Sequence, residues 1–294
     1  MKKLAAGLTA LVLATSCIDR HANYSNYLES YPHHVVSEEG IKEALAGKAM
    51  KENLQDLELY FFEVNFKKKA FELAEFKRMI KGYNAYLGAI SGEKFDVNHI
   101  IVTSSEELLV PPITGLYFFE SAVIVLKENK LSMPIFTHEY GHHTDKHRSL
   151  NCKDHTLVDA CKKEDKWLAI RSEAVAKAFE FYTAEKMGKT YPRYVEYLGL
   201  TSAPSGELGK ASSMEDFLEK VPYDFSSERY AAAATVFAIV NAHYATSFEE
   251  TWKRMRSMKP DSLFAILERI SKSHPWERVV NKSFHHLWIR SLKL

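Results

Sequence analysis

Apolar residues recur every three to four positions along most of the chain, a spacing that is typical of helices. Between Ser37 and Gly82 this spacing predicts two helices, the second of which stops at Gly82. Residues 98–103 and 115–127 are β-branched and aromatic instead, which predicts strands. Beyond Ser132 the helical spacing returns and continues to the end of the chain. We therefore expect an α+β fold that is mostly helical and contains a small antiparallel sheet.

The first residues of the chain have a different composition. Lys2 and Lys3 precede an apolar run that is too short to span a bilayer, a pattern typical of a secretory signal peptide, here residues 1–16. The run ends in LATSC, which resembles the bacterial lipobox, in which a cysteine, here Cys17, receives the lipid. This resemblance implies a lipoprotein of the bacterial cell envelope, held in the outer membrane and facing the periplasm or the cell surface. The alternative is an ordinary signal peptide in which Cys17 has no role.

The rest of the chain divides into three predicted regions. Residues 17–36 are polar and lack clear periodicity, which predicts a tether behind the lipid anchor. Residues 37–200 contain the N-terminal helices, the sheet and a candidate zinc-binding segment. Gly, Ser and Pro residues gather at 199–209, and these loop formers predict a boundary before a helical C-terminal lobe of residues 201–294.

Charge and cysteine content narrow the classes of function. A net charge of +1, without a basic face interleaved with aromatic residues, argues against nucleic-acid binding. Three cysteines are an odd number for an exported protein, but lipidation of Cys17 leaves Cys152 and Cys161 as a pair. In an oxidising compartment this pair predicts a disulfide, with two free buried thiols as the alternative.

Candidate metal ligands are concentrated in residues 136–147, FTHEYGHHTDKH. Pro134 in a first turn predicts one helix from residue 133 to about 147. Because positions i and i+4 lie on the same side of a helix, His138 and His142 can offer two nitrogens to one Zn²⁺ ion. Glu139 lies beside them and can hold a water molecule at the metal without being a ligand. The alternative is a row of histidines on a solvated helix face.

The HExxH pattern and the strand before it resemble the zincin metallopeptidases. In that family a strand antiparallel to the substrate precedes the HExxH helix, and residues 120–127 take that place here. The metzincin pattern HExxHxxGxxH does not fit, because Asp145 and Arg148 stand at its later positions. In the gluzincin branch a glutamate from a second helix is the third zinc ligand. The segment EAVA in a predicted helix of residues 166–188 is similar to that pattern and indicates Glu173.

Two features leave the third ligand open. Lys177 stands where gluzincins often have an aspartate, and Glu173 and Lys177 also have the spacing of an ordinary exposed ion pair. Glu180, Asp154 and His155 are therefore further candidates for the third ligand.

The resemblance implies a zinc-dependent peptidase that hydrolyses peptide bonds in the cell envelope, with Glu139 activating a water molecule at the metal. It also implies a donor to the oxyanion from the C-terminal lobe, for which Tyr230 is the candidate and His243 the second choice. An ordinary core or surface aromatic is the alternative for each. The expected partners are a peptide or protein substrate and, through the N-terminal lipid, the membrane. The alternative functions are a non-catalytic zincin-like binding or scaffold lipoprotein and a zinc amidase acting on cell-wall material.

Overall fold

The structure of the 294-residue chain is a computed structural model. It describes residues 46, 50–54, 57–62, 70–92, 99–104, 115–118, 123–128, 133–145, 163–187, 204, 206–221 and 227–291. The predicted signal peptide, the tether, Cys17, Cys152 and Cys161 lie outside these ranges and stay predictions. Within the described ranges no helix is both long enough and apolar enough to cross a membrane.

The described residues fall into two compact units. One contains the strands and ends at Thr144; we call it the sheet unit. The other begins at Asp145 and contains the helices from Lys163 onward; we call it the helical unit. The predicted loop at residues 199–209 lies mostly outside the described ranges, although Gly206–Gly209 forms a short helix, and the predicted lobe boundary stays a prediction.

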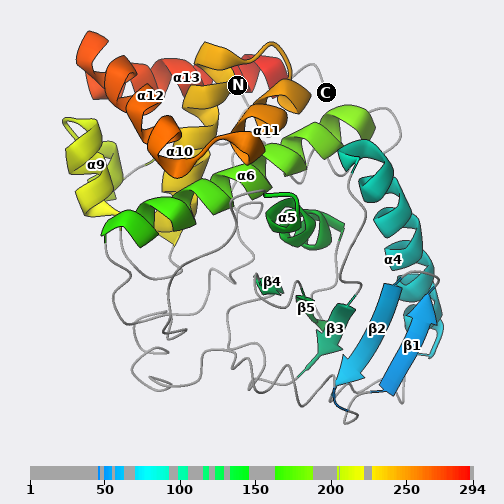
Figure 1. Ribbon diagram of the computed structural model, residues 1–294. Helices are drawn as coiled ribbons and strands as arrows, with labels where there is room; N and C mark the ends of the chain where they lie inside the picture. The colour runs from blue at the N-terminus through cyan, green and yellow to red at the C-terminus, as the bar shows by residue number, and fades with distance from the viewer. Residues whose placement is uncertain are drawn as a thin grey trace, which may run out of the picture. The chain divides into compact units, whose positions relative to one another are not determined.

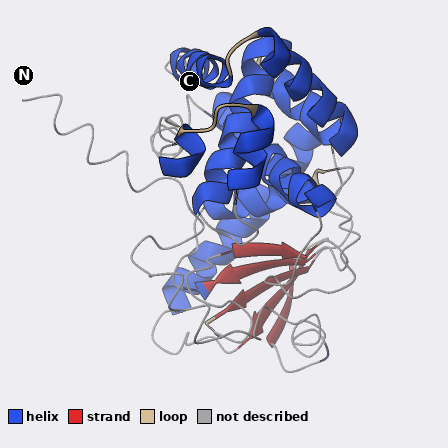
Figure 2. Ribbon diagram, turned by 90° about the vertical axis from the view of Figure 1, so that its left-hand side faces the viewer, coloured by secondary structure: helices blue, strands red, loops and turns tan. Residues whose placement is uncertain are grey.

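The sheet unit contains five strands that lie side by side (Figures 1 and 2). They are β1 (Met50–Leu54), β2 (Leu57–Phe62), β3 (His99–Thr103), β4 (Gly115–Phe118) and β5 (Val123–Lys127), in the spatial order β1-β2-β3-β5-β4. The mostly helical α+β class is confirmed. The sheet, however, is mixed and not antiparallel, because β3 pairs in parallel with both β2 and β5. Parallel neighbours need a crossover connection, and helix α4 (Ala70–Ser91) lies in the chain between β2 and β3.

Of the two helices predicted between Ser37 and Gly82, the first is wrong and the second is confirmed with a different end. Leu57–Phe62 is strand β2, which is paired on both sides and has Leu59, Tyr60 and Phe61 buried. Periodicity alone does not separate a short apolar run of this kind from a buried helix. The second predicted helix is α4, but it runs through Gly82 and ends at Ser91. Gly92 follows with φ 67°, a left-handed conformation that favours glycine, and its N–H donates to Gly88 O.

The predicted strand at residues 115–127 is two antiparallel strands. Gly115 of β4 pairs with Leu126 of β5, and β5 lies between β3 and β4 with Val123 to Leu126 buried. A sequence run that is apolar at consecutive positions is typical of such an interior strand. The described sheet therefore has β1 and β4 at its two edges, and β5, from the segment expected to lie along the substrate, lies inside it.

The helical unit is built around helix α6. Its helices are α6 (Lys163–Met187), α8 (Gly206–Gly209), α9 (Met214–Lys220), α10 (Ser227–Tyr244), α11 (Phe248–Ser257), α12 (Pro260–Ser273) and α13 (Trp276–Ser291). Helix α6 packs against α10 and α11 (Figure 1). Phe181 of α6 contacts Phe237 and Phe248 with ring centroids 5.0 and 5.2 Å apart, and these buried aromatic rings form the centre of the unit.

Candidate metal centre

The HExxH segment forms helix α5 (Met133–His143), as the sequence predicts. The helix packs against β4, β5 and α4 within the sheet unit. It ends earlier than predicted, because Thr144 closes its last turn: the Thr144 N–H donates to Tyr140 O at 3.1 Å and its hydroxyl donates to Gly141 O at 2.7 Å. Asp145 follows outside the helix.

The polar side chains of α5 are buried, not solvated. His138, Glu139 and His142 expose only 4%, 2% and 5% of their surface. Burial of polar groups costs free energy unless other groups compensate them, so proteins rarely bury several together without a specific partner. The alternative of histidines on a solvated helix face is therefore wrong.

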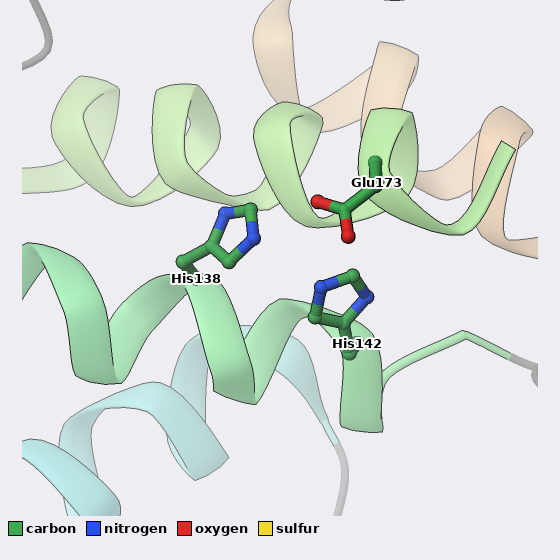
Figure 3. Close-up of side chains that lie close together, drawn as sticks. All are labelled: His138, His142 and Glu173. Carbon is green, nitrogen blue, oxygen red and sulfur yellow. The ribbon is translucent and has the colours of Figure 1, made fainter. Parts of the chain in front are cut away.

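His138, His142 and Glu173 converge on one point (Figure 3). Figure 3 shows the two histidines on one helix and the carboxylate of Glu173, from a second helix, directed at the space between them. One ligand atom from each of the three residues lies within 4.8 Å of the other two. The imidazole rings stand almost perpendicular, at 89°, with centroids 4.8 Å apart. The structure thus assembles the three predicted ligands.

The donor set fits Zn²⁺. Two imidazole nitrogens and one carboxylate oxygen are the protein ligands of many catalytic zinc sites, which keep a fourth position for water or substrate. Three atoms no more than 4.8 Å apart share a point that lies within about 2.8 Å of each, so for a cation at that point shifts of under about 1 Å bring the atoms to zinc bonding distances. Small side-chain rotations supply shifts of that size.

The surroundings of Glu173 decide between two interpretations of this residue, as a metal ligand or as one half of a surface ion pair. Glu173 is buried, with 6% of its surface exposed, so the exposed ion pair with Lys177 is wrong. Lys177 Nζ donates instead to Glu180 Oε2 at 2.7 Å, and Glu180 does not belong to the group of converging ligands. Asp154 and His155, which the sequence also allows as the third ligand, lie outside the described residues.

Glu139 lies against the edge strand. A Cβ atom placed on Gly115 of β4 would lie 2.9 Å from Glu139 Oε1 and 2.6 Å from Ile135 Cγ2. Real side chains do not approach that closely, so the missing Cβ of Gly115 leaves the space in which the Glu139 carboxylate sits. Sequence reasoning missed Gly115; its place at the start of an aromatic strand was the only signal.

A second residue of β4 supports the histidines. The Tyr117 hydroxyl and His143 Nδ1 form a buried hydrogen bond of 3.0 Å. The Tyr117 ring is nearly parallel to that of His142, at 12°, with centroids 6.5 Å apart. His143 lies outside the ligand group. Its hydrogen bond to Tyr117 therefore gives this buried histidine a structural role beside the ligands, which sequence spacing did not indicate.

The two candidate oxyanion donors lie on α10. Tyr230 is half-buried in the first turn of the described helix, and its catalytic role stays a prediction. His243 lies in the last turn and is largely exposed. Its partial burial lowers the pKa of His243, and the positive charges of Lys282 and His274 lower it further.

The chain matches no protein-family model, and no curated protein is significantly similar to it. The support for a metal centre in this chain therefore comes from the chemistry and geometry of its own residues.

Proposed function

We propose that this chain is a zinc-dependent metallopeptidase of the zincin type. His138, His142 and Glu173 hold the zinc ion, and Glu139 is the general base. The observation that carries the proposal is the buried convergence of two imidazoles and a carboxylate, with a further buried carboxylate one residue from the first histidine. The mixed sheet, with an antiparallel strand at its described edge and the HExxH helix packed on it, supports the zincin assignment.

The protein side chains divide the chemistry between them. Zinc, when bound, polarises the substrate carbonyl and makes water acidic enough to lose a proton near neutral pH. Glu139 accepts that proton at its carboxylate as the water oxygen bonds to the carbonyl carbon, and the same group then donates the proton to the amine that leaves when the C–N bond breaks. Gly115 leaves room for the carboxylate to hold its position during both transfers.

A peptide substrate is favoured by the edge strand. Among the described strands, β4 pairs with β5 alone, and no described strand pairs with its other side. An extended peptide binds to such an edge through its own backbone N–H and C=O groups. Gly115 of this strand stands next to Glu139, so a peptide paired along β4 would present its carbonyl groups near that base.

The proposed location is the bacterial cell envelope, with Cys17 as the lipid anchor and residues 17–36 as the tether. This part of the proposal comes from the N-terminal sequence alone. If one of the metal ligands were missing, a non-catalytic scaffold would be the better proposal. The buried Glu173 in the ligand group argues against that function.

The test is zinc content and peptide hydrolysis of the purified full chain beside Glu139→Gln. We expect about one zinc per molecule in both proteins and a rate of hydrolysis lower by about 10²- to 10⁴-fold in the variant, the usual contribution of a general base. Glu180→Gln, which neutralises a buried carboxylate outside the ligand group, is the matched control and should retain both zinc and most of the activity. Zinc-bound protein that cuts cell-wall amides but no peptide would shift the assignment to an amidase. Protein without zinc would overturn the proposal.

A further inference from the structure

Arg171 and Asp145 form an ion pair from which solvent is fully excluded. Arg171 Nη1 donates to both carboxylate oxygens of Asp145, at 2.7 and 2.6 Å, and both side chains are 0% exposed. A carboxylate paired with a guanidinium in this way has its direction fixed as well as its charge balanced. The pair takes no part in the proposed proton transfers.

The remaining donors of Arg171 hold the end of another helix. Its Nε donates to Met258 O at 2.8 Å, and its Nη2 donates to Met255 O at 2.9 Å and more weakly to Arg256 O at 3.4 Å. These carbonyls belong to the end of α11, where helix carbonyls lack partners within the helix. Every N–H-bearing nitrogen of the guanidinium therefore has an acceptor, and the Arg171 side chain is held at a fixed position.

The two residues also stand next to the metal ligands along the chain. Asp145 follows His142 by three residues, two positions past the end of α5, and Arg171 precedes Glu173 by two residues on α6. Side chains two positions apart on a helix point in nearly opposite directions, because each residue turns the helix by about 100°. Fixing Arg171 therefore fixes the rotation of α6 about its axis, and with it the direction of Glu173.

We infer that the Asp145–Arg171 pair is the positioning device of the metal centre. It joins the chain directly after the HExxH helix to the helix that supplies the third ligand, so that the histidines and the glutamate meet at one point. This inference rests on the proposed zinc site. Stability alone does not require the pair, since a buried ion pair is often no more stabilising than apolar residues of the same size.

The test compares zinc binding by the full chain, purified in mild detergent, with that of two variants. They are Asp145→Asn and the double variant Asp145→Asn/Arg171→Met, which leaves no unpaired buried charge. Zinc affinity is measured by competition with a chromophoric chelator, the coordination geometry by the visible spectrum of the Co²⁺-loaded protein, and the fold by thermal unfolding without metal. We expect zinc affinity to fall by about 10- to 100-fold in both variants, the usual effect of losing a group that orients a ligand, together with a changed cobalt spectrum. The double variant should still unfold cooperatively without metal, at a lower temperature than the parent, because the carbonyls at the end of α11 lose the donors of Arg171.

Lys186→Met is the matched control. It breaks the 3.1 Å pair of Lys186 with Glu249, which also joins α6 to α11, at a partly exposed position away from the ligands. Zinc affinity in this variant should stay within about twofold of the parent.

Three results would overturn the inference. A double variant with parental zinc affinity and an unchanged cobalt spectrum would show that the pair does not position the ligands. Failure of both variants to fold would make the pair a requirement of the fold. A parent chain that binds no zinc would overturn the proposed function as well, whereas the first two results leave that proposal standing.

Discussion

Helices α5 and α11 are almost equal in length, at 11 and 10 residues, but they place their polar residues in opposite ways. Helix α11 buries Phe248, Trp252 and Met255 and turns most of its charges to solvent. Those charges serve the helix itself: Lys253 pairs with Glu249, and Arg254 with Glu250, each four residues apart. Helix α5 instead buries every residue from Ile135 to His143, polar or not.

This difference in burial distinguishes two kinds of polar residue. Those of α11 stabilise their own helix, whereas those of α5 do not. The paired charges of α11, from Glu249 to Arg254, remain at least partly hydrated and cost the fold little free energy. The imidazoles and the carboxylate of α5 are removed from water, which destabilises the fold relative to an apolar helix of the same length. Binding of a cation would offset that destabilisation, because the converging side chains would then have a common partner.

The largest expected effect comes from replacing one of two adjacent buried histidines of α5. His142→Ala removes a ligand, and zinc affinity should fall by more than about 100-fold, beyond the usual loss for a residue that only orients a ligand. His143→Ala removes the hydrogen bond to Tyr117 and should lower the free energy of unfolding by about 1–3 kcal/mol while zinc affinity falls by less than about tenfold. Calorimetric zinc titration and chemical denaturation distinguish the two. Equal zinc affinities in both variants would remove His142 from the site.

Replacing either of two glycines by alanine should change the stability of the fold by a smaller amount, with opposite signs at the two positions. In Gly115→Ala the new methyl group meets Ile135 and Glu139, so we expect a loss of about 1–3 kcal/mol of stability and slower hydrolysis with unchanged zinc affinity. In Gly82→Ala the new methyl group meets nothing within 4 Å, inside α4, so we expect a gain of about 0.5–1 kcal/mol. Thermal unfolding measures both signs. A stabilised Gly115→Ala variant would contradict the assigned position of the Glu139 carboxylate.

The smallest effects concern the surface charges of α11. The Thr246 N–H, followed by Arg254 and the Thr246 hydroxyl, lowers the pKa of Glu250 to about 2. A carboxylate with a lowered pKa stabilises the fold above its unfolded pKa, near 4.5, and that contribution is lost as the pH falls towards 2. Between pH 4.5 and 2 the stability of the parent should therefore fall more steeply than that of Glu250→Gln, as acid titration followed by circular dichroism would show. Identical slopes would mean that Glu250 does not make this contribution.

Ser247→Ala removes the helix cap of α11, since the Ser247 hydroxyl accepts from the Glu250 N–H at 3.0 Å. We expect a loss of about 1 kcal/mol of stability by denaturant titration and no change in zinc affinity. A change in zinc affinity would show that the surface of α11 and the metal centre are coupled.

Local spacing was enough to predict that His138 and His142 share one side of a helix, whereas Glu173 was predicted from a resemblance to the gluzincin pattern. His138 and His142 are one helical turn apart, so the helix alone brings them to the same side, and EAVA marked Glu173 on a second long helix. The strands were harder, because β2 is a short apolar run with neighbours on both sides and its partners depend on contacts far along the chain.

Contacts between distant segments could not be read from sequence spacing. Arg171 meets Asp145 across 26 residues and the end of α11 across 84 to 87, and neither residue carries a motif. The space that Gly115 leaves for Glu139 likewise depends on how β4 packs on α5. Such contacts are set by tertiary packing, which local periodicity does not encode.

The most direct test of the metal centre is X-ray absorption spectroscopy at the zinc edge of the purified, zinc-loaded chain. We expect nitrogen and oxygen atoms at about 2.0–2.1 Å from the zinc, with imidazole scattering from two histidines in the parent and from one in His142→Ala. A shell containing sulfur at about 2.3 Å, or imidazole scattering that His142→Ala leaves unchanged, would place the zinc elsewhere and contradict the account.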